Sequence, residues 1–361
     1  MKAVYIHIPF CSSICSYCDF CKVLYQKQWI KPYLSNLEQE IKNQYQGELV
    51  KTLYIGGGTP TSLNLTELKQ LLNITKLFNL TKLEEFTVEC NVENLTVPKL
   101  KLMKQFGVNR LSIGVQTFNQ KHLTFLNRHH QLKQVQTIIK KARFLGFNNI
   151  NIDLMFGFPK QTLRELKFDL KQALKLKTEH LSIYSLIIEN NTLLRINKVP
   201  SINEDLNAKM YYYINKILNK YDYLHYEISN YAKPGYQSNH NLIYWQNEEY
   251  YGFGLGAVSY LNKVRYENTR SITNYLKGQY LKQKTNITKK EMMENEMILG
   301  LRQLTGVNIL KFKQKYKTDI KKVFPITKLL KEKLLIEENN YLFIPESKIF
   351  IANEILLNFI D

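Results

Sequence analysis

Three cysteines, Cys11, Cys15 and Cys18, lie close together near the start of the chain, with the spacing C-x3-C-x2-C. They follow an apolar segment, residues 4–8, that predicts a β-strand, and Pro9 ends this strand because it has no backbone N–H to donate. A loop after a strand can direct its thiolates toward one point, whereas successive residues of a strand face opposite sides. Thiolates grouped in this way bind a soft metal, either zinc or the iron of an iron–sulfur cluster.

The number of thiolates distinguishes these two kinds of metal site. A structural zinc ion takes four ligands, commonly from two separated pairs. No second pair is present, since Cys21 lies close by and Cys90 stands alone. An iron–sulfur cluster held by three thiolates leaves one iron without a protein ligand, which suits a cluster that must bind another molecule. A zinc site and three incidental buried cysteines remain as the alternatives.

The segments that must position these cysteines alternate between strand and helix patterns. Such alternation is typical of a parallel sheet, so the first part of the chain has a predicted α/β fold. We predict six strands, over residues 4–8, 52–55, 85–90, 110–116, 149–156 and 180–186. Helices are predicted over residues 31–45, 66–78, 97–106, 120–126, 132–145, 162–175 and 203–221, and an extra strand over residues 226–231.

Polar residues recur near the carboxyl ends of these strands, where parallel barrels build their active sites. A polar side chain in an apolar strand is costly unless it is paired, so a shared ligand explains the recurrence best. The run Gly56-Gly57-Gly58-Thr59 allows backbone N–H groups to approach a ligand closely. No Gly-Lys-Ser/Thr follows it, which excludes a nucleotide-phosphate loop of that type. The other polar residues at these ends are Glu89, Gln116, Asp153, Tyr184 and Ser185.

The cysteine spacing on the loop after the first strand, with Tyr17 directly before Cys18, resembles the radical S-adenosylmethionine (SAM) superfamily. The resemblance implies a partial (β/α)6 barrel with a [4Fe–4S] cluster on the three cysteines. It also implies that SAM binds the open iron and is cleaved reductively to a 5′-deoxyadenosyl radical. The flanking sequences YIHIPFC and CDF resemble the branch that holds oxygen-independent coproporphyrinogen III dehydrogenases (HemN-type) and HemW-type heme chaperones.

The same resemblance assigns roles to individual residues. Glu89 resembles a carboxylate that binds SAM, and Arg128 falls where the family keeps an arginine near SAM. Whether one or two SAM molecules bind is left open. The full set of SAM contacts implied by the resemblance is Tyr5, Tyr17, Gly57, Gly58, Thr59, Glu89, Gln116, Arg128, Asp153 and Ser185.

A second motif, His-Asn-x-x-Tyr-Trp, begins at His240. Taken alone, this is a loop histidine, and such histidines are more often structural hydrogen-bond partners than ligands. The motif resembles the heme-binding motif of the HemW-type chaperones, which implies that His240 ligates heme iron with Tyr244 and Trp245 against the porphyrin. The glycine-rich residues 252–257 resemble a loop that closes over the SAM site, although Val258 stands where the family commonly has a histidine.

The pattern changes near residue 287 to helices with one short strand. Helices are predicted over residues 292–304, 309–316, 326–335 and 349–359, and a strand over residues 341–344. This resembles the small, mostly helical, winged-helix-like C-terminal domain of the family. We therefore predict a radical SAM partial barrel over residues 1–232, a connecting segment with the HNxxYW motif and glycine-rich loop over 233–286, and the C-terminal domain over 287–361.

The composition limits the partners and the compartment. The 361 residues carry a net charge of +19, but the lysines are spread along most helices instead of forming a stripe, which disfavours nucleic acid. A basic surface suits anionic partners, such as heme propionates or the anionic face of a membrane that the protein contacts peripherally. No apolar run reaches membrane-spanning length and no signal region precedes the cysteines, so we expect a cytoplasmic protein.

Two features favour the chaperone branch over the dehydrogenases. The dehydrogenases resemble the pattern C-x3-C-x2-C-x-C, and Phe20 stands at the position of their fourth cysteine. Those enzymes also carry an N-terminal extension before the cluster, which is not seen before Cys11. We expect a heme chaperone, with heme, an unidentified heme acceptor, and an electron donor such as flavodoxin or ferredoxin as partners. The alternatives are a SAM-dependent coproporphyrinogen III dehydrogenase and, third, a radical SAM enzyme that modifies RNA. Whether the protein is an enzyme is left open.

Overall fold

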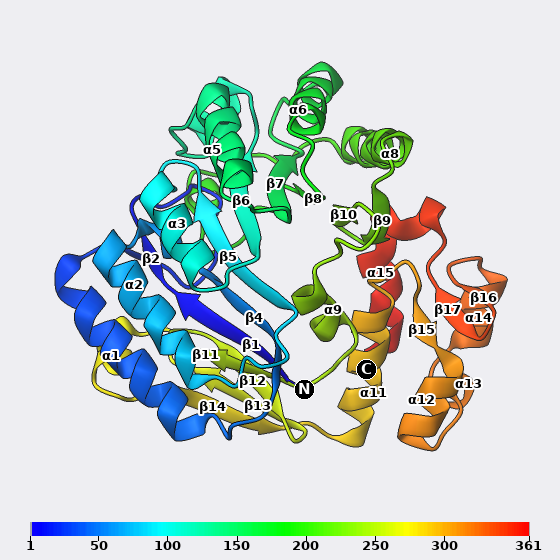
Figure 1. The fold of residues 1–361 in the computed structure, drawn as a ribbon. Helices are drawn as coiled ribbons and strands as arrows, with labels where there is room; N and C mark the ends of the chain where they lie inside the picture. The colour runs from blue at the N-terminus through cyan, green and yellow to red at the C-terminus, as the bar shows by residue number, and fades with distance from the viewer. Residues whose placement is uncertain (1, 361) are drawn as a thin grey trace.

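The computed structural model describes residues 2–360. One curved sheet of 12 strands carries helices on its outer face, and a smaller C-terminal region lies at one side (Figure 1). The six predicted strands form its centre as parallel neighbours in chain order, because a crossover after each of the first five returns the chain to the end at which the previous strand began. They are β1 (Lys2–Ile8), β4 (Val50–Gly57), β5 (Glu85–Asn91), β6 (Arg110–Gln116), β7 (Ile150–Phe156) and β8 (His180–Ser185).

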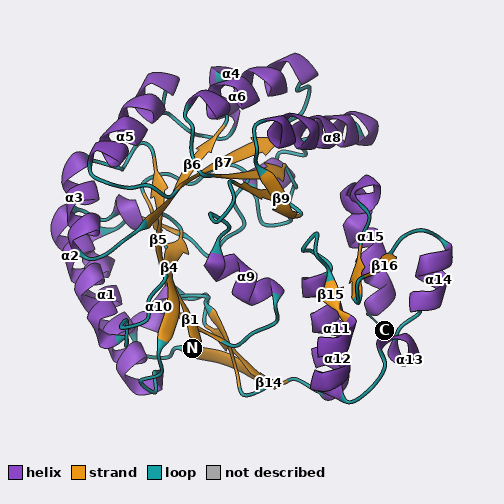
Figure 2. Cartoon of the chain, turned by 45° about the vertical axis from the view of Figure 1, so that its right-hand side comes forward, coloured by secondary structure: helices purple, strands orange, loops and turns teal. Residues whose placement is uncertain are grey.

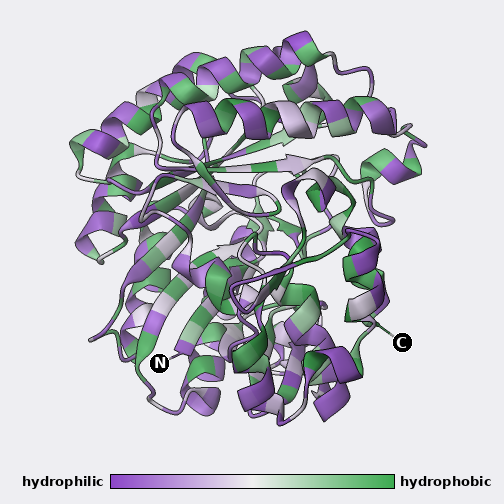
Figure 3. Cartoon of the chain, turned by 90° about the vertical axis from the view of Figure 1, so that its right-hand side faces the viewer, coloured by the Kyte–Doolittle hydropathy of each residue, from purple (hydrophilic) through white to green (hydrophobic). Residues whose placement is uncertain are grey.

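Amphipathic helices cover the outer face of this sheet (Figure 2). In α5 (Leu132–Phe144), the buried residues Val135, Ile138, Ile139 and Ala142 follow the helical repeat and form one apolar stripe toward the strands. Figure 3 shows the consequence, since hydrophilic and hydrophobic positions alternate around the helices at the rim. The other covering helices are α1 (Lys27–Gln44), α2 (Leu65–Ile74), α3 (Val97–Gln105), α4 (Gln120–Phe125), α6 (Leu163–Lys175) and α8 (Glu204–Lys220).

Side-chain caps fix where several of these helices begin. Asn64 and Glu67 form a reciprocal capping box at the start of α2, and Thr162 and Glu165 form another at the start of α6. Each box satisfies two backbone N–H groups that would otherwise lack partners. The sequence placed the start of α1 at residue 31, whereas this helix begins at Lys27 and contains Pro32.

The sheet extends beyond the six central strands at both edges. The single strand predicted over residues 226–231 is wrong, because two short antiparallel strands, β9 (Leu224–Glu227) and β10 (Asn230–Ala232), occupy this edge. At the other edge, β11 pairs parallel with β1, and three antiparallel strands follow. The segment that we expected to connect two domains thus supplies four strands, which are β11 (Tyr250–Phe253), β12 (Val258–Leu261), β13 (Val264–Asn268) and β14 (Leu281–Asn286).

The C-terminal region combines helices with a three-stranded sheet in the order β15-β17-β16. The expectation of one strand in this region is wrong, because β15 (Val307–Asn308) and β16 (Ile336–Glu338) pair with the predicted β17 (Tyr341–Phe343). The helix predicted over 349–359 is divided, with a 3-10 turn on each side of α15 (Ala352–Leu356). The remaining helices are α11 (Lys289–Gly300), α12 (Ile309–Tyr316), α13 (Ile320–Val323) and α14 (Ile326–Lys331).

This region is joined to the far edge of the main sheet. The backbone N–H of Ile228 donates to the Arg302 carbonyl at 3.2 Å, and that of Leu304 donates to the Tyr226 carbonyl at 3.1 Å. A short helix, α9 (Asn239–Trp245), lies between the sheet and α11 (Figures 1 and 2). Within residues 2–360, no helix combines the length and the apolar character needed to cross a membrane.

Candidate functional site

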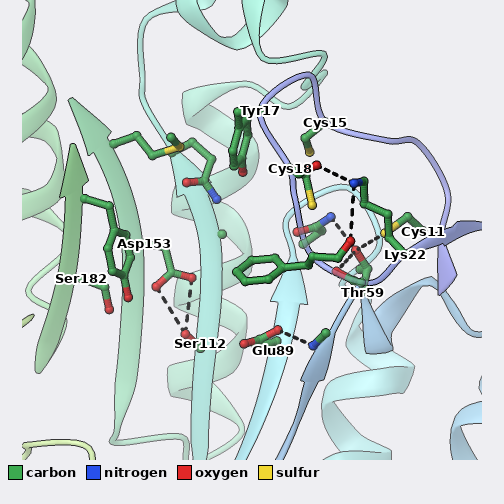
Figure 4. Close-up of a pocket in the computed structure, with 18 of the residues that line it drawn as sticks. Cys11, Cys15, Tyr17, Cys18, Lys22, Thr59, Glu89, Ser112, Asp153 and Ser182 are labelled. Atoms are coloured by element: carbon green, nitrogen blue, oxygen red, sulfur yellow. Dashed lines mark hydrogen bonds between the residues drawn. The ribbon is translucent and has the colours of Figure 1, made fainter. Parts of the chain in front are cut away.

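A cavity of about 480 Å³ lies between the cysteine loop and the inner face of the central strands (Figure 4). We call it the cysteine cavity. Strands far apart in the sequence contribute to it, as the polar strand ends predicted. The residues predicted from the sequence that line it are Cys11, Cys15, Tyr17, Cys18, Gly57, Gly58, Thr59, Glu89, Gln116, Arg128, Asp153 and Ser185.

The cysteine loop is tied down at both ends and at its tip. Its two ends pair as short parallel strands, β2 (Phe10–Cys11) and β3 (Val23–Leu24). At the tip, the Ser16 hydroxyl donates to the Phe125 carbonyl at 2.8 Å, and the Asn127 side-chain amide donates to the Ile14 carbonyl at 2.8 Å. These bonds hold the three thiols at the mouth of the barrel (Figure 4).

The burial of the cysteines differs along the loop. Cys11 is buried, whereas Cys15 and Cys18 are partly exposed to the cavity. Burial raises the pKa of the Cys11 thiol to about 11, although a hydrogen bond from Thr59, 3.7 Å between Oγ1 and Sγ, opposes this. Within residues 2–360, no three His, Cys, Asp or Glu side chains are grouped tightly enough to hold a single metal ion.

The glycine run of β4 allows the cysteine loop to lie directly against the strand. A Cβ on Gly58 would lie 2.6 Å from the Pro9 carbonyl oxygen and 2.9 Å from Cys11 Sγ. Gly57 has a φ of +113°, and a Cβ there would lie 2.6 Å from the His7 ring. Side chains at these two positions would therefore push the cysteine loop and β1 away from β4.

Two carboxyl groups face the cysteine cavity from neighbouring strands. Glu89 accepts hydrogen bonds from the Tyr54 hydroxyl at 2.8 Å and from the Gly57 N–H at 2.9 Å. Burial raises the pKa of Glu89 to about 7, although these hydrogen bonds favour the carboxylate. Asp153 accepts a bond from the Asn151 side-chain amide at 2.6 Å, and burial raises its pKa as well.

Arg128 brings a buried cation to the cysteines. Its guanidinium donates to the Gly114 carbonyl at 2.7 Å and to the Asn91 side-chain oxygen at 3.0 Å, and it lies 3.2 Å from a Glu93 carboxylate oxygen. The same guanidinium lies 4.0 Å from Cys15 Sγ. Its Nε has no hydrogen-bond partner within residues 2–360. A buried donor of this kind is suited to an anionic ligand in the cavity.

Gln116 lines the cavity at an irregularity in β6. The register between β6 and β7 shifts after Gly114, and Gln116 has a φ of +69°. Bulges of this type turn a side chain away from its ordinary strand direction, and positive φ values in residues other than glycine concentrate at ligand sites.

Comparison with known proteins connects this geometry to a family. Residues 5–173 match the model of the radical SAM superfamily, and residues 287–349 match the HemN C-terminal domain. The chain is 41% identical to the heme chaperone HemW of Lactococcus lactis, over 99% of this chain and 97% of the relative. It is 42% identical to the heme chaperone HemW of Bacillus subtilis, over 98% and 96%. The chain belongs to the HemW family.

A solved structure supports the fold of this HemW-family protein. The coproporphyrinogen III oxidase HemN of Escherichia coli, described as a radical SAM enzyme, superposes with a TM-score of 0.87 at 22% identity, over 99% of this chain and 89% of that one. The α/β barrel with a helical C-terminal region, predicted from the sequence, is confirmed.

Membership of the radical SAM superfamily implies a [4Fe–4S] cluster and SAM, and the residues of the cysteine cavity fit them. Three thiols open onto one cavity, which is the donor set that iron–sulfur clusters use. Arg128 and Glu89 line the same cavity, so it combines a buried guanidinium with a carboxyl group. SAM carries both an amino group and a carboxylate, so a site with both kinds of partner is suited to it.

Two predicted site residues lie outside the cysteine cavity. Tyr5 lines a neighbouring cavity and its hydroxyl lies 3.0 Å from His7 Nδ1. The expectation of a loop at His240 is wrong, because this residue lies in α9, whose N-terminus Ser238 caps. The His240 ring is 1% exposed, with Nδ1 2.9 Å from the Thr52 hydroxyl and Nε2 2.9 Å from the Tyr244 hydroxyl.

Both nitrogens of His240 are therefore engaged inside the protein. The ring also stacks on Tyr54 at a centroid distance of 5.0 Å, and burial lowers its pKa to about 3. Ligation of heme iron by His240 would require the ring to leave these partners. Of the other residues of the motif, Tyr244 and Trp245 line the neighbouring cavity that Tyr5 lines, and Asn241 lines the cysteine cavity.

Several cavity residues were not predicted from the sequence. Tyr54 and Ser112 lie on strands between predicted site residues, and strand alternation at period 2 would have placed them on the inner face. Arg110 is a charge at the start of an apolar strand, and its Nε has no partner within residues 2–360. The unpredicted residues at the cavity include Lys22, Tyr54, Asn91, Arg110, Ser112, Asn151 and Ser182.

Proposed function

We propose that this protein is a heme chaperone, which binds heme and delivers it to an acceptor protein. The observation that carries the proposal is the match to HemW proteins of two bacteria along almost the whole chain. Phe20, at the position of the fourth dehydrogenase cysteine, supports the same choice. The likeness to the coproporphyrinogen III oxidase concerns the fold, so decarboxylation of coproporphyrinogen III is the second candidate. Nothing in the cavities favours the third, RNA modification.

We propose that Cys11, Cys15 and Cys18 hold the [4Fe–4S] cluster and leave one iron open for SAM. A bound cluster supplies an electron for the reductive cleavage of SAM, delivered from a donor such as flavodoxin or ferredoxin. The position of Cys21 supports this ligand set, because Cys21 lines the neighbouring cavity and not the cysteine cavity. We assign SAM contacts to Tyr17, Gly57, Gly58, Thr59, Glu89, Gln116, Arg128, Asp153 and Ser185, and Tyr5 remains a proposed contact from the adjoining cavity.

The proposed heme surface includes Tyr244 and Trp245. Axial ligation by His240 remains a proposal, and it requires that α9 opens to release the two hydrogen bonds of the ring. We also propose a cytoplasmic location, because all five cysteines are free thiols. The basic charge supports contact with an anionic acceptor or with the anionic face of a membrane.

The test uses anaerobically reconstituted protein. Hemin titration should produce a saturable Soret band, and incubation with coproporphyrinogen III, SAM and a reductant should give no protoporphyrinogen. Protoporphyrinogen at enzyme-like turnover without hemin binding would overturn the proposed function.

The role of His240 is tested by two variants. His240→Ala should diminish the Soret band if the imidazole ligates iron, whereas Thr52→Val removes only a hydrogen-bond partner of the ring and should retain the band. Equal loss of stability in both variants with an unchanged Soret band would show that His240 has a structural role only.

A further inference from the structure

Arg110 is a buried cation that is not among the proposed SAM contacts. It is the first residue of β6, it is 2% exposed, and it lines the cysteine cavity. Its Nη1 donates to the Thr87 hydroxyl at 3.5 Å, and its Nε has no hydrogen-bond partner within residues 2–360. A guanidinium that is removed from water with so few hydrogen bonds needs negative charge nearby.

Two carboxyl groups on the neighbouring strands supply this charge. β6 lies between β5 and β7, and side chains two residues apart on a strand share a face. In the register, Glu89 of β5 stands opposite Ser112, and Asp153 of β7 stands opposite Gly114. Figure 4 shows Glu89, Ser112 and Asp153 together on the inner face. Arg110 precedes Ser112 by two residues on β6, so it lies on the same face and deeper in the barrel.

The charge of Arg110 acts on both carboxyl groups. Burial raises the pKa of Glu89 to about 7 and also raises the pKa of Asp153, and the positive charge of Arg110 opposes both shifts. The hydrogen bonds that Tyr54 and the Gly57 N–H donate to Glu89 also favour its carboxylate, whereas the charge of Asp153 disfavours it.

The other titratable groups around this pair are neutral. Burial raises the pKa of Tyr5, on β1, well above its ordinary value, so its hydroxyl brings no charge to Glu89. Burial and the charge of Arg110 lower the pKa of His180 well below its ordinary value and the pKa of His240 to about 3. Neither imidazole therefore contributes positive charge to the inner end of the cavity.

We propose that Arg110 is a positioning residue for SAM, because its charge keeps Glu89 and Asp153 ionised at the inner end of the cysteine cavity. This inference rests on the proposed SAM site and adds to it a residue that acts through the two carboxylates. An ionised carboxyl group accepts hydrogen bonds from amino and hydroxyl groups, and SAM carries both. Without the charge of Arg110, both carboxyl groups would hold a proton more tightly, and SAM binding would have to displace it.

SAM binding to reconstituted protein at several pH values tests this role. In Arg110→Gln, Glu89 should hold its proton to a pH about one unit higher, because a nearby opposite charge is lost. The variant should therefore bind SAM about tenfold more weakly than wild type at pH 6, but only about twofold more weakly at pH 8. The titration of SAM itself is common to both proteins and cancels in this ratio. An equal loss at both pH values would overturn the proposal, because a merely structural role of Arg110 has no such pH dependence.

Two variants retain the charge. Arg110→Lys keeps a cation, and Thr87→Val removes only the hydrogen-bond partner of the guanidinium, so both should follow the wild-type pH profile. Arg164→Gln, on the exposed face of α6, is the matched control. Where Arg110→Gln yields no folded protein, the two charge-retaining variants decide. A wild-type profile in both supports the proposal, and a loss of SAM binding concentrated at low pH in either would overturn it. Iron and sulfide content verify that the cluster is retained.

A second readout needs neither SAM nor the cluster. The infrared band of a protonated carboxyl group that Glu89→Gln removes belongs to Glu89. In the cluster-free chain its midpoint should lie near pH 7 in wild type and about one unit higher in Arg110→Gln, and Arg110→Lys should leave it unchanged. An unmoved midpoint in Arg110→Gln would overturn the proposal whether or not SAM binds. If the midpoint moves as expected but wild type binds no SAM at any pH, the influence of Arg110 on Glu89 is confirmed and the proposed SAM site is overturned.

Discussion

At the scale of single residues, Glu89 is the side chain whose environment is most distinctive. Tyr54 and Gly57 donate hydrogen bonds to its two oxygens, at 2.8 and 2.9 Å. Burial nevertheless raises its pKa to about 7, so near neutral pH the group is divided between its protonated and ionised forms. A cationic ligand group in the cysteine cavity would shift this balance toward the carboxylate.

We expect Glu89→Ala to weaken SAM binding about ten- to a hundredfold, because a charged hydrogen bond to a bound ligand contributes about 1.5–3 kcal/mol. Equilibrium binding to reconstituted protein measures this. Glu204→Ala, at the exposed start of α8, is the matched control and should retain wild-type affinity. An unchanged affinity in Glu89→Ala would remove Glu89 from the SAM site.

The raised pKa of Glu89 also predicts a pH dependence of stability. The unfolded chain releases this proton near pH 4.5 and the folded protein near pH 7, so in this window the folded state binds more protons. The free energy of unfolding therefore falls as pH rises from about 5 to 7, by about 2–3 kcal/mol from this group.

Glu89→Gln removes this titration and should make the dependence shallower. Asp169 and Glu227, with pKa values raised by burial to about 6 and about 7, continue to contribute in the same direction. Urea unfolding of the apo protein at several pH values measures the difference. Identical slopes in wild type and Glu89→Gln would contradict the prediction.

At the scale of elements, the contact between the end of β4 and the cysteine loop positions the thiols. Gly58 leaves room for Pro9 and Cys11, and the Gly58 N–H donates to the Ile8 carbonyl at 2.8 Å. A methyl group at residue 58 would meet backbone, which cannot move aside as a flexible side chain can.

We expect Gly58→Ala to lower the yield of cluster reconstitution and to destabilise the protein by about 1–3 kcal/mol, the usual cost of inserting a methyl group into a packed site. Iron content after anaerobic reconstitution and urea unfolding measure the two effects. Circular dichroism should show that the secondary structure is retained. Normal iron content in a folded variant would show that the loop tolerates displacement from β4.

Helices and strands whose apolar residues recur at a regular spacing were predictable from sequence. Elements that depend on contacts with distant parts of the chain were not. The six central strands are apolar and short, and the helices between them carry clear apolar stripes. β14 was missed because most of its residues are exposed and polar, so no apolar alternation marks it. α9 has 7 residues and contains two asparagines, which are poor helix formers, and Ser238 and tertiary packing stabilise it.

Part of the candidate site was predictable, because a cysteine or a carboxyl residue at the carboxyl end of an apolar strand is recognisable in the sequence. The sequence therefore predicted that the three cysteines, Glu89 and Asp153 lie together, and all of them line the cysteine cavity. It did not place Tyr5, which lines the neighbouring cavity, or His240, which is buried in α9 with both ring nitrogens engaged. Both positions depend on contacts between distant segments, which no local pattern encodes.

At the scale of the whole molecule, the neighbouring cavity that Tyr5, Tyr244 and Trp245 line exists only because three distant parts of the chain meet. β1, the strands after α9, and Leu299 of the C-terminal region all line it. Trp245 lines both this cavity and the cleft between α9 and the C-terminal region, and the Arg302 guanidinium lies 5.8 Å from its ring centroid. The docking of the C-terminal region therefore sets the position of a wall of the cavity.

Phe350 contributes to this docking from the other side of the interface. Its ring lies 5.7 Å from Tyr211 and 6.4 Å from Tyr212, both on α8, and the Tyr212 hydroxyl donates to the Ser347 carbonyl at 2.8 Å. Phe350 is half-buried, so its truncation removes part of the contact area of a core phenylalanine and leaves the hydrogen bond of Tyr212 in place.

We expect Phe350→Ala to lower the free energy of unfolding by about 1–3 kcal/mol, below the cost for a fully buried phenylalanine. It should also speed proteolysis between the barrel and the C-terminal region, while iron reconstitution on the distant cysteines stays normal. Leu357→Ala is the matched control, because that side chain is 66% exposed and should change stability by less than about 0.5 kcal/mol. If the two variants unfold at the same denaturant concentration, the aromatic contact between α8 and Phe350 does not hold the C-terminal region in place.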